Sequence, residues 1–144
     1  MKRILLLLPR INLFLHHNQG RILKIILLAL VFITALYTKE YTGEFQTLIT
    51  SHIGGILYVL FGALLFSLVF TRMASWQSAL LALSITSMLE FVQYLRIPFM
   101  IELTRYKVFL YLLGNSFNWM DFVYYVMGAV LGYFVVMLIG HREG

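Results

Sequence analysis

The sequence predicts an all-α polytopic membrane protein with four transmembrane helices. Of its 144 residues, 61% are hydrophobic and only 12% are charged, whereas a soluble domain carries about 25% charged residues. The apolar residues form continuous runs, each roughly long enough to cross about 30 Å of hydrocarbon as a helix. Because these runs do not alternate with polar residues, spanning strands are not expected. The chain length suits one small domain.

The first twenty residues predict an amphipathic segment that lies on the inner leaflet. Basic residues flank a short leucine run that Pro9 interrupts, and this run is too short for the core of a signal peptide. Its aliphatic residues would enter the lipid while its basic residues contact anionic head groups. We therefore divide the chain into this N-terminal extension (1–20), a four-helix membrane domain (21–140) and a cytoplasmic tail (141–144).

Four apolar runs follow the extension and predict spanning helices over about 22–38, 53–71, 76–95 and 122–140. Basic residues gather before and at the start of the first run, where Arg21 and Lys24 lie, and Arg72 follows the second run. Because cytoplasmic segments of membrane proteins carry an excess of Lys and Arg, both termini are predicted to be cytoplasmic.

The loop before the fourth run predicts a short helix on the outer face. Its apolar part, about 104–114, is too short to span the membrane and favours an interfacial or re-entrant helix. Thr104 is placed to begin this helix and Gly114 to end it. Asn118 is expected to cap the fourth spanning helix, and Asp121 lies where the positive end of the helix dipole would stabilise a carboxylate.

The third run contains a carboxylate that a lipid-facing helix would not tolerate. Thr86, Glu90 and Gln93 recur at spacings of four and three residues, so they share one helix face. An ionised carboxylate at the centre of a spanning helix costs about 2.5–3.5 kcal/mol on insertion scales. We therefore expect this face to turn into the bundle, with Arg105 from the outer loop as the simplest ionic partner for Glu90.

The fourth run carries a polar and glycine stripe at spacings of four, three and four: Asp121, Tyr125, Gly128 and Gly132. The glycine pair would let another helix approach closely. If the third helix is that neighbour, Glu90 meets Asp121 near the outer surface.

These patterns predict an outer-leaflet ligand site built from Glu90, Gln93, Arg105, Lys107, Asp121 and Tyr125. The hypothesised ligand is an anionic amphiphile, such as a lipid-linked envelope precursor, a phospholipid or a lipophilic drug. Arginine presents a fork that suits phosphate or carboxylate, and mostly apolar sites with few polar groups suit such ligands. The lipid bilayer is the expected partner, and no cofactor is expected.

The same residues also have structural interpretations. Glu90 and Gln93 could join helices by hydrogen bonds, Asp121 could stabilise a helix start, and Arg105 and Lys107 could reach lipid phosphates. A second functional hypothesis is an intramembrane enzyme acting on a lipid, with Glu90 or Asp121 as the general base. A third is a small structural subunit that contacts other membrane proteins in an envelope complex.

Several classes of chemistry are not expected. The chain has no cysteine, which excludes disulfides and thiolate chemistry. No His-x-x-x-His or similar spacing predicts a metal site. The net charge of +5 comes largely from the basic residues that precede the first span, which is a topology signal and not a nucleic-acid-binding face.

A set of residues in the second half of the chain resembles a known group of proteins. The string EFVQYLRIP is followed by an arginine, by LLG, by FNWMDFVYYVMG and by a further glycine. This set resembles an uncharacterised family of small bacterial membrane proteins related to the VanZ-like proteins. The residues that carry the resemblance are Glu90, Gln93, Pro98, Arg105, Gly114, Phe117, Trp119, Asp121, Tyr125, Gly128 and Gly132.

The resemblance covers about 21–140 and implies a multi-pass protein of the bacterial cytoplasmic membrane, without a settled activity. VanZ-like proteins usually have Asn four residues after the aspartate, where this chain has Tyr125. This departure favours the uncharacterised branch over a role in glycopeptide resistance.

Overall fold

All the regular structure in the described part of the chain is helical. The computed structural model describes residues 19–46, 48–95, 98–103, 105–107, 109 and 118–140. In chain order its elements are α2 (Gln19–Glu40), the π-helical turn η1 (Leu48–Ile53), α3 (Gly54–Val69), α4 (Ser75–Tyr94), α5 (Pro98–Leu103) and α7 (Trp119–Gly140). The all-α prediction is confirmed for these residues. Nearly all of the predicted N-terminal extension and the whole tail lie outside them.

The four long helices form where the apolar runs predict them, and the structure shows what starts two of them. Asn118 precedes α7, and its side-chain Oδ1 accepts a 3.1 Å hydrogen bond from the backbone N–H of Met120. The predicted N-cap is therefore confirmed. At the start of α4, the Gln77 side chain accepts a 2.9 Å hydrogen bond from the backbone N–H of Ala74, which satisfies a donor that the helix itself leaves unpaired.

The structure has a short helix, α5, before the segment in which the sequence predicts one. α5 starts at Pro98, whose ring fixes φ near the helical value and whose missing N–H is not needed in a first turn. Of the predicted helix at 104–114, the structure describes 105–107 and 109, and the proposed ends at Thr104 and Gly114 fall outside the described residues.

Three helical segments among the described residues are long and apolar enough to cross a membrane: Gln19–Glu40, Leu48–Val69 and Trp119–Gly140, each of 22 residues. The 20-residue α4 is not among them, because serines, threonines, glutamines and Glu90 dilute its apolar residues. The protein thus carries three helices suited to a bilayer, and a fourth, more polar long helix packed against them.

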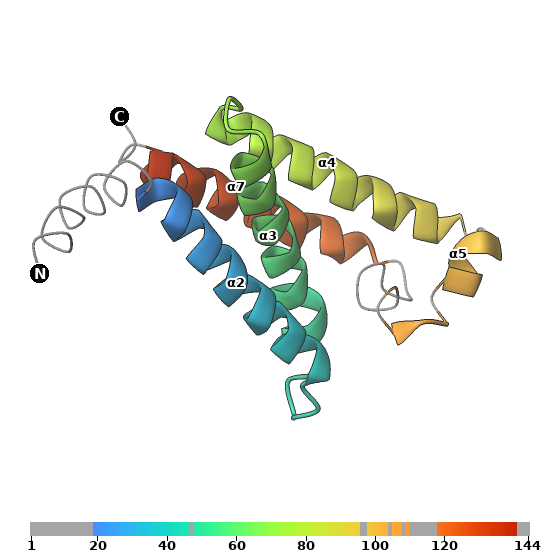
Figure 1. Cartoon of the computed structure of the whole chain (residues 1–144). Coiled ribbons are helices and arrows are strands. Elements are labelled where there is room, and N and C mark those ends of the chain that lie inside the picture. The colour runs from blue at the N-terminus through green and yellow to red at the C-terminus, as the bar shows by residue number, and fades with distance from the viewer. Residues whose placement is uncertain are drawn as a thin grey trace, which may run out of the picture.

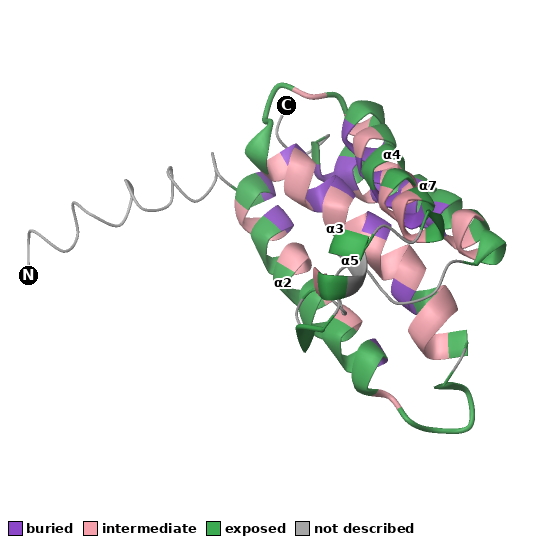
Figure 2. Ribbon diagram, turned by 90° about the vertical axis from the view of Figure 1, so that its right-hand side faces the viewer, coloured by how far each residue is buried: buried purple, intermediate pink, exposed green. Residues whose placement is uncertain are grey.

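The helix α3 lies at the centre of the bundle and contacts all three other long helices, whereas α4 packs on α3 and α7 (Figure 1). One buried cluster joins α3, α4 and α7 and includes Val59, Ala82 and Ala129. A second cluster centres on Leu64, Val136 and Ile139, with partly buried residues of α2 against it. Figure 2 shows the buried residues on the sides of the helices that face one another.

Gly128 and Gly132 of α7 face α3 and not α4. A Cβ atom built on Gly128 would lie 2.6 Å from the backbone oxygen of Ile56, and one built on Gly132 would lie 2.7 Å from the Cβ of Ala63. Glycine at these positions lets the two backbones approach closely. The condition that the third spanning helix, α4, is the neighbour of this glycine pair is therefore not met, because α3, the second, occupies that side of α7.

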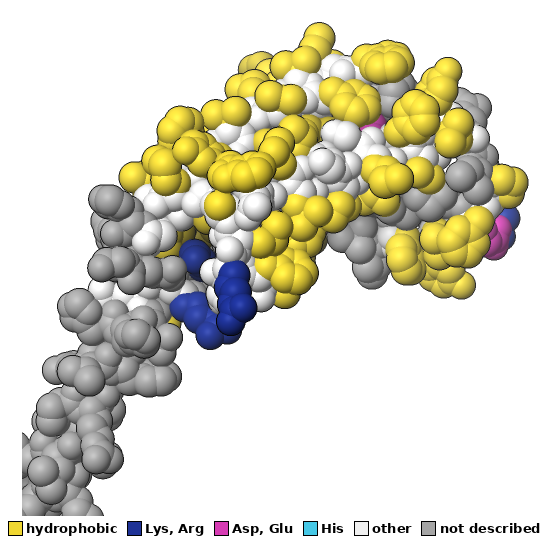
Figure 3. Space-filling view, turned by 90° about the horizontal axis from the view of Figure 1, so that it is seen from above, with side chains coloured by type: hydrophobic (Ala, Val, Ile, Leu, Met, Phe, Trp, Pro, Cys, Tyr) yellow, Lys and Arg dark blue, Asp and Glu magenta, His cyan; other side chains and the backbone are white. Residues whose placement is uncertain are grey.

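The outer surface of the bundle is apolar, as a lipid environment requires. Large hydrophobic side chains such as Ile33, Met88 and Leu138 are 62%, 71% and 63% exposed, and hydrophobic side chains cover much of the face in Figure 3. Lys and Arg side chains gather toward one end in the same view. The start of α2 and the turn between α3 and α4 share that end in Figure 1.

Candidate functional site

Glu90 lies on the face of α4 that packs against α7, and its side chain is buried, with 4% of the residue exposed. One carboxylate oxygen, Oε2, accepts a 2.8 Å hydrogen bond from the Tyr125 hydroxyl. The other, Oε1, accepts a 3.3 Å hydrogen bond from the backbone N–H of Asn118. Hydrogen bonds to an ionised acceptor are stronger than neutral ones. Glu90 thus holds the first two turns of α7 against α4.

The polar face of α4 turns inward as its spacing predicts. Thr86 is 6% exposed, but its hydroxyl donates to the backbone oxygen of Ala82 in the same helix, at 2.8 Å. Gln93, one turn beyond Glu90, is partly buried. Because Thr86 is satisfied within its own helix, Glu90 and Gln93 are the residues of this face that can contribute polar atoms to a site.

Asp121 lies in the first turn of α7, where the positive end of the helix dipole stabilises a carboxylate. Its side-chain Oδ1 is a buried atom, and it has no hydrogen-bond partner among the described residues. Asp121 also lies within electrostatic range of Glu90. The two carboxylates of the predicted site are therefore brought together at the start of α7.

His52 completes one wall of the same region. It lies in η1, and its ring stacks on that of Tyr124, with 4.2 Å between the ring centroids. His52 lies within electrostatic range of Asp121. Its Nδ1 is a second buried atom for which the described part of the chain supplies no hydrogen-bond partner.

Lys39, in the last turn of α2, supplies a positive charge. It interacts electrostatically with both Asp121 and Glu90. We refer to Lys39, His52, Glu90, Asp121 and Tyr125 together as the Glu90 cluster. It joins the end of α2, η1, the C-terminal part of α4 and the start of α7.

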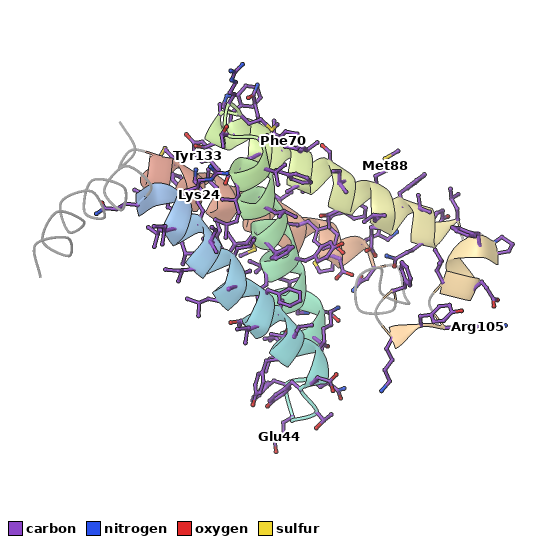
Figure 4. All side chains as sticks on the ribbon, in the orientation of Figure 1. Lys24, Glu44, Phe70, Met88, Arg105 and Tyr133 are labelled. Atoms are coloured by element: carbon purple, nitrogen blue, oxygen red, sulfur yellow. The ribbon has the colours of Figure 1, made fainter. Side chains whose placement is uncertain are left out.

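The expected ion pair between Glu90 and Arg105 is wrong. The Arg105 Nη1 atom lies 3.0 Å from Oε1 of Glu102, and the two side chains are 73% and 63% exposed. Figure 4 shows Arg105 pointing away from the bundle. Glu102 lies within one helical turn of Arg105, so that pair forms without burial of either charge. Glu90 instead receives hydrogen bonds from α7, and the exposed Lys107 lies outside the cluster.

The cluster includes two residues that the predicted site omits. From the sequence alone, Lys39 is a charged residue of the first loop, and His52 is a polar residue at the boundary of the second span. The available signal is their position, because Lys39 ends the first apolar run and His52 precedes the second. In an antiparallel bundle, these two points lie at the same end as the close of the third run and the start of the fourth, where Glu90 and Asp121 lie.

The Glu90 cluster can accept hydrogen bonds from a polar group, and donate hydrogen bonds to it, at the edge of an apolar bundle. Asp121 can accept a hydrogen bond from a hydroxyl or an ammonium group, and Lys39 can donate to an anionic oxygen. Within the described residues, no three His, Asp or Glu side chains are grouped so as to hold a metal ion.

Comparison with known proteins gives one match. No curated protein matches the chain, and no solved structure matches it. A family described as "Protein of unknown function (DUF2809)" matches residues 45–129. The matched region includes His52, Glu90, Asp121 and Tyr125, and it begins after the helix that carries Lys39. The description names no activity, so the resemblance to VanZ-like proteins rests on the sequence motif alone. Because the match covers more than half of the chain, the chain belongs to this DUF2809 family.

Proposed function

We propose that this chain is a multi-pass membrane protein that binds an amphiphile through the anionic part of its head group, at the Glu90 cluster. The candidate ligands are a phospholipid, a lipid-linked envelope precursor and a lipophilic drug. In the proposed topology four helices span the bacterial cytoplasmic membrane and both termini are cytoplasmic. The cluster then lies in the outer leaflet.

The observation that carries this proposal is the pair of buried polar atoms without a hydrogen-bond partner among the described residues, Oδ1 of Asp121 and Nδ1 of His52. Buried polar atoms in proteins nearly always have a partner, and leaving one unpaired costs about 1–3 kcal/mol. Both atoms belong to one cluster that also contains a lysine. A polar head group at this place would satisfy them.

The residues of the cluster have different roles in this proposal. Lys39 contacts the anionic oxygen of the ligand, the role that the sequence alone assigns to Arg105. Glu90 is a positioning residue, because its two hydrogen bonds hold the start of α7 and therefore Asp121. The exposed Arg105 and Lys107 attract anionic head groups to this side of the protein without contacting the bound ligand in the cluster.

The proposed topology follows from the connections and the charges. The short turn between α3 and α4 reverses the general course of the chain, so these helices run in opposite senses although their axes cross (Figure 1). If α4 spans, the start of α2 and the end of α7 lie on one side of the membrane. Arg21, Lys24 and Arg72 then lie on that side, which the distribution of basic residues in membrane proteins assigns to the cytoplasm.

The test is native mass spectrometry of the full chain in mild detergent, titrated with phosphatidylglycerol. We expect saturable binding that Lys39→Met weakens about tenfold, the effect of losing one hydrogen bond to a charged group. The matched control is Arg72→Gln, which removes an exposed positive charge at the other end of the bundle and should leave binding unchanged. Equal binding by the wild type and Lys39→Met would overturn the proposal.

A further inference from the structure

We propose that the preferred head group carries a primary ammonium beside its phosphate, as phosphatidylethanolamine does. This inference rests on the proposed function and specifies the ligand of the same site. The ammonium would lie at Asp121 and His52, and the phosphate would lie at Lys39.

The balance of charge in the Glu90 cluster favours a head group of both signs. Within the described residues, two carboxylates, Glu90 and Asp121, lie within electrostatic range of each other and of one lysine, Lys39, and His52 adds no charge in its neutral form. A head group with only negative charge would gain attraction from Lys39 and suffer repulsion from both carboxylates. An ammonium on the same head group would instead be attracted by the two carboxylates. A zwitterion therefore matches the cluster better than a simple anion.

The two buried atoms that lack a hydrogen-bond partner among the described residues determine which kind of cation fits. Oδ1 of Asp121 is an acceptor, and Nδ1 of His52 is an acceptor when the ring carries its proton on Nε2. A primary ammonium has three N–H donors and can serve both atoms at once. A quaternary ammonium, as in phosphatidylcholine, has the charge but no donor.

The stacking of His52 on Tyr124 makes this arrangement specific. The ring contact restrains the plane of the imidazole, so the direction of Nδ1 is limited without a hydrogen bond from the described residues. Asp121 is held by the start of α7, where its own backbone N–H donates to the backbone oxygen of Asn118 at 3.0 Å. Because neighbouring groups hold both acceptors in place, the two acceptors are preorganised to bind one small donor group.

The experiment compares phospholipids that share the same acyl chains and a phosphate and differ in the rest of the head group. The full-length wild type, in mild detergent, is titrated with phosphatidylethanolamine, phosphatidylcholine or phosphatidylglycerol, and lipid binding is read by native mass spectrometry. We expect phosphatidylethanolamine to bind about tenfold more tightly than either of the others. Asp121→Asn should reduce its advantage over phosphatidylcholine to within about twofold, because the charge-assisted hydrogen bond from an ammonium N–H to the carboxylate, which phosphatidylcholine cannot make, becomes a weaker bond to an amide oxygen.

The outcomes separate this inference from the proposed function. Binding that depends on Lys39 but is equal for the three lipids, or is tightest for phosphatidylglycerol, overturns the ammonium inference and leaves the proposed function standing. Binding that does not depend on Lys39 for any of the lipids overturns both. The comparison of lipids on the wild type needs no substitution, so it decides the question even where Asp121→Asn does not fold.

Discussion

The hydroxyl of Tyr125 donates a 2.8 Å hydrogen bond to the carboxylate of Glu90, across 35 positions of sequence. This contact joins α7 to α4 within an apolar interface, where a lone carboxylate would be costly. It also sets the position of the helix start that carries Asp121.

The Tyr125–Glu90 contact should be measurable as a coupling energy. Tyr125→Phe removes one hydrogen bond to a charged group and should lower the free energy of unfolding by about 1.5–3 kcal/mol. In a double-mutant cycle with Glu90→Gln, the two losses should be non-additive by about 0.5–3 kcal/mol. Unfolding of the purified protein by titration with a denaturing detergent gives these values.

The matched control for this cycle is Tyr37→Phe, since Tyr37 is 74% exposed and the change should be nearly neutral. Additive effects of Tyr125→Phe and Glu90→Gln would show that the hydroxyl and the carboxylate do not interact energetically.

Gly128 of α7 should resist even the smallest side chain. In Gly128→Ala the new methyl group meets the Ile56 backbone 2.6 Å away, and backbone cannot move aside as a flexible side chain can. We expect a loss of about 1–3 kcal/mol from overpacking, measured as a lower midpoint of thermal unfolding in detergent.

Gly140→Ala is the control for this substitution, because a Cβ there has nothing within 4 Å. It should be neutral or slightly stabilising, since alanine favours a helix more than glycine does. A Gly128→Ala protein as stable as Gly140→Ala would refute the close approach of α7 to α3.

The start of α7 should depend on the Asn118 side chain. Asn118→Ala removes the acceptor of the Met120 N–H and should cost about 1 kcal/mol. Asn118→Ser restores a capping oxygen and should recover most of the stability. Hydrogen–deuterium exchange at the first turn of α7 is the measurement, and identical exchange in the alanine and serine variants would contradict the capping role.

The proposed topology predicts which loops are accessible from outside the cell. The chain has no cysteine, so single cysteines can be introduced and labelled with a membrane-impermeant maleimide in intact cells. Cysteines at Glu44 and Glu102 should react from outside, and one at Arg72 should react only after the cells are permeabilised. Reaction at Arg72 and Glu102 from the same side would show that α4 does not cross the membrane.

Local properties of the sequence determined the helices and the face that Glu90 shares with Thr86 and Gln93. The helical repeat places residues four and three apart on one side, and the cost of an exposed carboxylate in lipid turns that side inward. The cap at Asn118 followed from the same local chemistry, because a capping side chain bonds backbone two residues away.

Tertiary structure decided which groups meet on that face. Tyr125 and the Asn118 backbone contact Glu90 where Arg105 was expected, Gly128 packs on α3, and Lys39 and His52 join the cluster from the first half of the chain. The helical repeat fixes the direction of a side chain relative to its own helix. It carries no information about which neighbouring helix lies opposite, because that choice depends on how all the helices pack together.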